Sequence, residues 1–196
     1  MAVTAVVTVA GCSHTIDGAA QRASADSQDP DRSFGYVDDR CGLLADSTIQ
    51  EILAADYGIS TSVWSVTSYT ELARDAIAAE RWNMLHPTSE PRRSYLHEQL
   101  SGQPGPIISA SDYVRALADQ IVPYLPGHEM FVLGTDGFGR SETRENLRRH
   151  FEVDAASIVV ATLYQLSKMG QVEPRVVAEA ITKFKIDPDK VDPSRA

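Results

Sequence analysis

Residues 130–142 read Met130-Phe-Val-Leu-Gly-Thr-Asp-Gly-Phe-Gly-Arg-Ser-Glu142, an apolar run followed by a glycine-rich segment and a polar sequence. The apolar run has the length of a buried strand, and the glycines of residues 134–139 predict a tight turn. The residues that follow predict a helix over 142–150, with Ser141 as its N-cap. A strand that passes through a short turn into a helix is the repeating unit of an α/β protein.

The same alternation extends through most of the chain. Strands are expected at residues 62–67, 107–110 and 130–133, and helices at 48–56, 70–85, 112–125, 155–169 and from Pro174 onward. Helix 155–169, capped by Asp154, is apolar around most of its circumference and is expected to be largely buried. The last helix has a single apolar stripe and is expected on the outside. The pattern therefore predicts an α/β layer with a mainly parallel sheet.

The first 56 residues differ from the rest of the chain. They carry nine acidic and three basic residues and include a Ser-, Asp- and Gln-rich run at 23–33. We therefore expect an unrelated N-terminal segment over 1–56, with an apolar start, a flexible linker and a short helix, followed by a domain over 57–196. Because only the domain shows extended periodic apolar faces, we expect it to fold and residues 1–33 to be mobile.

The apolar start ends in Val9-Ala-Gly-Cys12, which resembles the lipobox of a bacterial lipoprotein, where the cysteine is lipidated. A secretory signal also needs basic residues before its apolar run, yet the first basic residue is Arg22. The run is also far shorter than the roughly 20 residues of a membrane-spanning helix. We favour a frayed apolar N-terminus, and Cys12 is the lipidation candidate of the alternative, a membrane-anchored lipoprotein.

The composition excludes some functional classes. The chain has 196 residues, of which 43% are hydrophobic, and its net charge is -9. One domain with a tail is expected, and the acidic balance opposes binding to nucleic acid or to an anionic membrane. The two cysteines, Cys12 and Cys41, lack the spacing of a zinc site. A cysteine-free remainder suits the reducing cytoplasm, where we expect the protein to be located.

The glycine-rich turn occupies the position at which α/β proteins bind phosphate groups. Residues 134–141 match neither the G-x-G-x-x-G nor the G-K-[ST] pattern, and Asp136 and Glu142 would repel an anion. We favour a structural turn in which glycines adopt positive φ, and an anion site is the alternative.

The helix after the turn offers charged and imidazole side chains. Arg144, Arg148 and Arg149 either bind an acidic partner or form a solvated face with the neighbouring glutamates. We interpret His150 and His86 as packing or helix-end residues, because no Ser, Cys or Asp partner stands at a spacing typical of a catalytic triad.

Four segments carry a resemblance to a known family. They are Val63-Trp-Ser-Val-Thr-Ser-Tyr-Thr-Glu-Leu-Ala-Arg-Asp75, Glu80-Arg-Trp-Asn-Met-Leu-His-Pro87, Ser109-Ala-Ser-Asp-Tyr113 and residues 134–154. In order and spacing they resemble the C-terminal domain of the homodimeric pyruvate dehydrogenase first component, over about residues 57–196. Transketolases share only the Asp-x-Phe-Gly-x-Ser outline. The resemblance implies a three-layer α/β/α fold of the transketolase C-terminal type.

The resemblance also implies a function. Members of this family use thiamine diphosphate and magnesium to decarboxylate pyruvate and to acetylate the lipoyl group of the dihydrolipoyl acyltransferase component. Their cofactor lies between two preceding domains of a dimer, while the C-terminal domain contributes to the dimer interface and to the approach to the active site. The residues expected in these interface or channel roles are Asp136, Gly137, Phe138, Gly139, Arg140, Ser141, Glu142, Arg144 and His150.

The chain departs from the family in its cofactor-binding motifs. It shows no Gly-Asp-Gly motif with a downstream Asn and no domain that would supply the activating glutamate. We therefore expect no cofactor, metal or catalytic residue in this chain by itself, and no activity of the chain alone. Because apolar surface that is buried in the family would be exposed here, we expect self-association near Trp82 and residues 134–141. A lipid-anchored binding module and a small anion-binding domain are the alternative functions.

Overall fold

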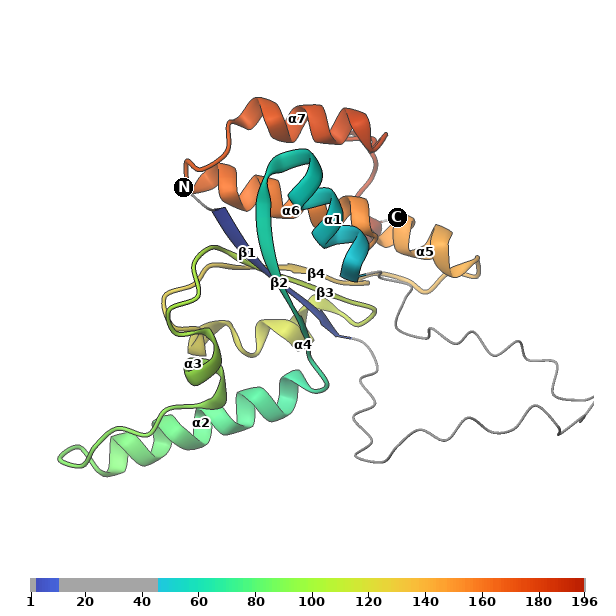
Figure 1. Ribbon diagram of the computed structural model, residues 1–196. Helices are drawn as coiled ribbons and strands as arrows, with labels where there is room; N and C mark the ends of the chain where they lie inside the picture. The colour runs from blue at the N-terminus through green and yellow to red at the C-terminus, as the bar shows by residue number, and fades with distance from the viewer. Residues whose placement is uncertain (1–2, 11–45, 196) are drawn as a thin grey trace, which may run out of the picture.

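The computed structural model describes residues 3–10 and 46–195, which form a parallel sheet with helices on both faces (Figure 1). The strands are β1 (Val3–Ala10), β2 (Ile59–Ser65), β3 (Ile107–Ser111) and β4 (Met130–Leu133). Their order is β2-β1-β3-β4, and every neighbouring pair is parallel. The predicted α/β/α fold with a parallel sheet is confirmed.

Strand β1 occupies an internal position in this sheet. It pairs with β2 from Val3↔Ile59 to Val9↔Ser65, and with β3 from Val6↔Ile107 to Ala10↔Ser111. For residues 3–10, the expectation of a frayed and mobile N-terminus is therefore wrong. A run rich in Val and Thr has the composition of a buried parallel strand, and its backbone fills the position between β2 and β3. Cys12, Cys41 and the linker lie outside the described residues.

Three helices lie on one side of the sheet: α1 (Asp46–Tyr57), α6 (Ala155–Lys168) and α7 (Pro174–Lys183). Ile49 and Leu53 of α1 are completely buried in a core that includes Ile108 and Ala110 of β3 and the apolar face of α6. The expected boundary near Asp56 thus falls within a helix that belongs to the packed α/β unit. Helix α7 lies outside α6, as its single apolar stripe predicts (Figure 1).

The opposite face is covered by α2 (Tyr69–Leu85), α3 (Tyr95–Leu100) and α4 (Arg115–Asp119). Helix α3 falls in a stretch where no helix was expected, and Ser94 caps it by accepting the His97 N–H at 3.2 Å. Helix α4 is much shorter than the expected helix over 112–125. Pro123 cannot donate a helical hydrogen bond, and the chain there forms a 3-10 turn (Val122–Tyr124) instead.

After β4 the chain forms a loop (residues 134–143) and then α5 (Arg144–Phe151). The side chain of Thr143, rather than that of Ser141, accepts the N–H of Asn146, at 3.4 Å, so the prediction of Ser141 as the N-cap is wrong. Asp154 caps α6 as predicted, accepting the Ser157 N–H at 2.9 Å. Beyond α7, residues 184–195 form a segment that returns to α5 and to the loop, which we call the C-terminal strap.

The carboxyl edge of the sheet as a candidate functional site

The predicted site residues lie where strands β3 and β4 end. The carboxyl ends of parallel strands meet at one edge of a sheet, and this is the edge at which open α/β proteins bind ligands. Here the loop after β4 is attached to the chain that follows β3. The Thr135 N–H donates to the carbonyl of Tyr113 at 2.9 Å, and its hydroxyl donates to the carbonyl of Asp112 at 2.8 Å. The two segments therefore form one connected structure.

Arg115 holds the acidic residue of the loop. Its Nε donates to Oδ2 of Asp136 at 2.7 Å, and its backbone N–H donates to the same oxygen at 3.3 Å. A Cβ atom at Gly134 would lie 2.7 Å from the carbonyl oxygen of Tyr113 and 2.8 Å from the nitrogen of Arg115. Gly134 is thus required for this close approach of the loop to α4. The sequence predicted Asp136 as a site residue but not the arginine that neutralises it.

The tip of the loop is positioned by the C-terminal strap. Gly137 has a φ of 111°, and a Cβ atom at this position would lie 2.5 Å from the carbonyl oxygen of Pro193. Two residues further on, a Cβ at Gly139 would meet no atom within 4 Å. Between these glycines, Phe138 is 83% exposed. The loop is therefore held up to Gly137 and presents one large aromatic side chain, Phe138, to solvent.

Glu142 precedes α5 and remains charged. Its Oε1 accepts the Thr143 N–H at 2.9 Å. This backbone hydrogen bond, with a contribution from the side chain of Asn146, lowers the pKa of Glu142 below its ordinary value, because both interactions favour the carboxylate. Since Glu142 is at the N-terminal end of α5, its negative charge also suits the helix dipole.

A pocket of about 480 Å³ opens at this edge. Of the predicted site residues, it brings together Gly139, Arg140, Glu142 and Arg144. Its other lining residues are Asp112, Thr135, Leu147, Arg148, Phe151 and Val153. Asp136 borders a neighbouring pocket with the strap, and His150 lies in a third pocket beside the strap, so the predicted residues do not share one cavity.

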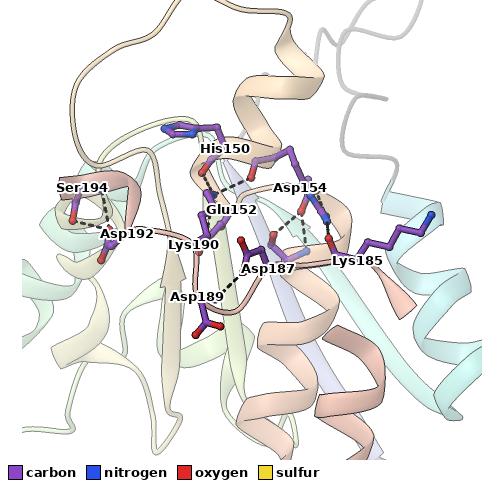
Figure 2. A network of polar contacts seen from close by, with 11 residues as sticks. His150, Glu152, Asp154, Lys185, Asp187, Asp189, Lys190, Asp192 and Ser194 are labelled. Atoms are coloured by element: carbon purple, nitrogen blue, oxygen red, sulfur yellow. Dashed lines mark hydrogen bonds and ion pairs between the residues drawn. The ribbon is translucent and has the colours of Figure 1, made fainter. Parts of the chain in front are cut away.

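His150 is placed at the C-terminal end of α5, next to the strap (Figure 2). The Nζ atom of Lys190 donates to the backbone carbonyls of Arg149 and His150 and contacts Oε1 of Glu152 at 3.1 Å. Lys190 thereby satisfies carbonyls that the helix leaves unpaired at its C-terminal end. Arg149 also holds the strap against α5. Its Nη1 donates to the carboxylate of Asp154, and its Nη2 donates to the backbone carbonyls of Phe184 and Lys185.

The imidazole of His150 is in an environment that disfavours its protonated form. Its Nε2 is buried without a hydrogen-bond partner, and its ring contacts Phe151 edge to face, with 4.9 Å between the ring centroids. Desolvation, together with the positive charges of Arg140 and Lys190, lowers the pKa of His150, whereas Glu152 opposes the shift. The imidazole of His150 therefore packs against Phe151, and the strap contacts the backbone carbonyl of His150 through Lys190.

The carboxylates at this edge do not fit a magnesium diphosphate site. Asp136 pairs with Arg115, and Asp112 lies 3.4 Å from Nη2 of Arg148. Within residues 3–10 and 46–195, no group of three or more His, Cys, Asp or Glu side chains is arranged to hold a metal ion. In the same part of the chain, no helix is both long enough and apolar enough to cross a membrane.

Sequence analysis did not identify Asp112, Arg115 or Lys190 as site residues, and the sequence marks them only indirectly or not at all. Asp112 directly follows strand β3, so the rule for carboxyl ends of parallel strands identifies its position. Arg115 is three residues further on, and no motif marks it. Lys190 is distant in sequence from α5 and comes into contact with it only because the strap returns after α7.

Comparison with known proteins agrees with this architecture. Residues 45–154 match the family described as "Transketolase-like TK C-terminal domain". The chain is 53% identical over 146 residues to the pyruvate dehydrogenase E1 component of Escherichia coli, a match that covers 74% of this chain and 16% of the relative.

Two further relatives have the same name. The identity is 51% over 143 residues with the Pseudomonas aeruginosa protein, covering 73% of this chain and 16% of the relative. It is 46% over 161 residues with the Cupriavidus necator protein, covering 79% and 18%. The chain thus spans about a sixth of the length of these relatives. It belongs to the transketolase-like C-terminal domain family and corresponds to the part of pyruvate dehydrogenase E1 components that it matches.

Proposed function

We propose that this chain performs the role of the C-terminal domain of a pyruvate dehydrogenase E1 component. It would form part of a subunit interface and of the approach to an active site that other domains build. The observation that carries this proposal is the identity of 53% over 146 residues. The activity in question is the thiamine-diphosphate-dependent decarboxylation of pyruvate and the acetylation of the lipoyl group of the acyltransferase component.

The residues of the carboxyl edge support an interface role for this chain. Phe138 is largely exposed on a loop that Arg115 and the C-terminal strap hold in place. A fixed loop with an exposed aromatic side chain loses little conformational entropy on association, which favours protein contacts. The group Asp136, Gly137, Phe138, Gly139, Arg140, Ser141, Glu142, Arg144 and His150 keeps this proposed role.

The chain alone would neither bind thiamine diphosphate nor decarboxylate pyruvate, because Asp112 and Asp136 at the carboxyl edge pair with arginines rather than converge on a metal. Isothermal titration calorimetry with magnesium and the cofactor is expected to give no saturable heat. Saturable binding with a Kd of about 1 μM would overturn this part of the proposal. A cytoplasmic location is also proposed, on the ground that no cysteine occurs after Cys41.

Self-association is part of the proposal, because Ile77, Met84, Leu85 and Phe138 expose large apolar side chains. Sedimentation equilibrium over about a hundredfold range of concentration is expected to show a dimer or a larger species. The variant Phe138→Ser is expected to weaken association more than Val191→Ser, which removes an exposed apolar side chain from the strap. A monomer at every concentration would contradict the interface role.

A further inference from the structure

Three arginines line the 480 Å³ pocket at the carboxyl edge: Arg140, Arg144 and Arg148. Arg140 and Arg144 have exposed side chains, and neither forms an ion pair with any residue in the described part of the chain. Arg148 comes from the next turn of α5 and reaches the same pocket. Two of the three guanidinium groups are thus available to a ligand without breaking an existing ion pair.

Arg148 is the most buried of these arginines and the least well compensated for its burial. Its side chain is only 13% exposed, and its Nε and Nη1 atoms are buried without hydrogen-bond partners. Its single ion pair is a 3.4 Å contact from Nη2 to Asp112, whose side chain is 59% exposed. Removing a guanidinium from water is costly unless an anion lies close to it. The interior end of the pocket therefore carries a positive charge that a second anion would stabilise.

The acidic residues around the pocket do not cancel this charge. Asp112 and Glu142 are the acidic lining residues, and Glu142 is already engaged by the Thr143 N–H. Asp136, which the sequence identified as repelling an anion, is paired with Arg115 and borders a different pocket. Three cationic side chains thus face two carboxylates across the cavity, and the balance is positive.

We propose that this pocket binds the oxyanion group of a small molecule, a phosphate or a carboxylate. Guanidinium groups form strong, charge-assisted hydrogen bonds to both, and Arg140 and Arg144 are the residues available to make them. Leu147, Phe151 and Val153 give the pocket an apolar wall against which a carbon skeleton would pack. The proposed site differs from a phosphate loop because its donors are side chains and not the amides of the glycine-rich turn. It does not depend on the proposed role in an E1 component.

The test is a titration of the 196-residue chain followed by NMR amide shifts, with inorganic phosphate as one probe and succinate as the other. At least one of them is expected to give saturable shifts at Arg144, Leu147 and Phe151, with a Kd of about 1 mM or tighter. Saturable shifts with phosphate alone would identify a phosphate site, and saturable shifts with succinate alone would identify a carboxylate site. Absence of saturable shifts with both probes would overturn the proposal.

The matched variants are Arg140→Gln with Arg144→Gln, and Arg175→Gln as a control. Arg175 is an exposed arginine on α7, paired with Glu179, and does not line the pocket. The double variant is expected to weaken binding by at least about tenfold, because it removes both guanidinium groups that are free to form charge-assisted hydrogen bonds to the anion. The control is expected to bind within about twofold of the unmodified chain. Equal affinity of the double variant and the control would exclude the arginine site. If the double variant does not fold, the single variant Arg140→Gln tests the same site.

Discussion

Nε of Arg115 and Oδ2 of Asp136 lie 2.7 Å apart, although the two residues are separated by 21 positions in the sequence. This pair connects the start of α4 to the loop after β4. It is supplemented by a hydrogen bond from the Arg115 backbone to the same oxygen, at 3.3 Å. The relationship explains how a glycine-rich loop can hold a defined position at the carboxyl edge of the sheet.

Replacing Asp136 by Asn is therefore expected to destabilise the fold. The ion pair is partly exposed, so the loss in the free energy of unfolding should be about 1 kcal/mol. Urea unfolding measures it. Glu129→Gln is the control, because it removes the more exposed pair with Lys168 and should change stability by less than about 0.5 kcal/mol. Equal effects of the two variants would show that the loop does not depend on Arg115.

A methyl group at Gly137 is expected to be more damaging than one at Gly139. Gly137 combines a φ of 111° with a close approach to the carbonyl of Pro193, so Gly137→Ala must distort the loop or displace the strap. The expected loss in the free energy of unfolding is at least about 1 kcal/mol, against less than about 0.5 kcal/mol for Gly139→Ala. Thermal unfolding of both variants decides the matter, and identical melting temperatures would contradict the proposed contact with the strap.

Lys190 is expected to anchor the C-terminal strap. Lys190→Met keeps the aliphatic stem but leaves the carbonyls at the end of α5 without the ammonium that they bind. Limited proteolysis should then cleave within residues 184–195 faster than in the unmodified chain. Lys168→Met, which removes an exposed ammonium from α6, serves as the control. If both variants are cleaved at the same rate as the unmodified chain, Lys190 does not hold the strap.

The pH dependence of stability should include a contribution from His150. Because burial, Arg140 and Lys190 lower its pKa in the folded state, protonation favours the unfolded chain. The contribution of His150 to stability is therefore present above its ordinary pKa of 6.5 and is lost as the pH falls through and below that value. An NMR titration should place the imidazole midpoint below 6.5, and the variant His150→Gln should have a flatter stability profile between about pH 5 and 7. A midpoint above 6.5 would contradict this environment.

The fold was largely predictable from hydrophobic patterns. The apolar runs of β3 and β4 and the helical periodicity of α2, α6 and α7 each indicate a local structure that packing then reinforces. Strand β1 was not predictable in the same way, because its run of Val and Thr follows no turn signal and its partners are more than 50 residues away along the chain. Only the pairing with β2 and β3 makes it a strand.

The candidate site was predictable in part. The position of residues 134–144 at the carboxyl edge follows from the alternation of strand and helix, and the glycines indicate the turn. Which charges are neutralised was not predictable, because Arg115, Arg148 and Lys190 reach their partners through the tertiary fold. The arginine pocket was not predictable either, because the sequence places Asp136 close to it as a repelling charge, and only the fold shows that Asp136 pairs with Arg115 and borders a different pocket.

This chain is proposed to act as the C-terminal domain of an E1 component through its surface, without supplying the cofactor site. The most direct test exchanges the matched region of the Escherichia coli enzyme for the corresponding residues of this chain and measures pyruvate-dependent acetylation of the lipoyl group. We expect the chimera to retain at least about a tenth of the rate of the parent enzyme, because at 53% identity most interface contacts should persist. A chimera that folds, dimerises and binds thiamine diphosphate but has no activity would contradict the claim.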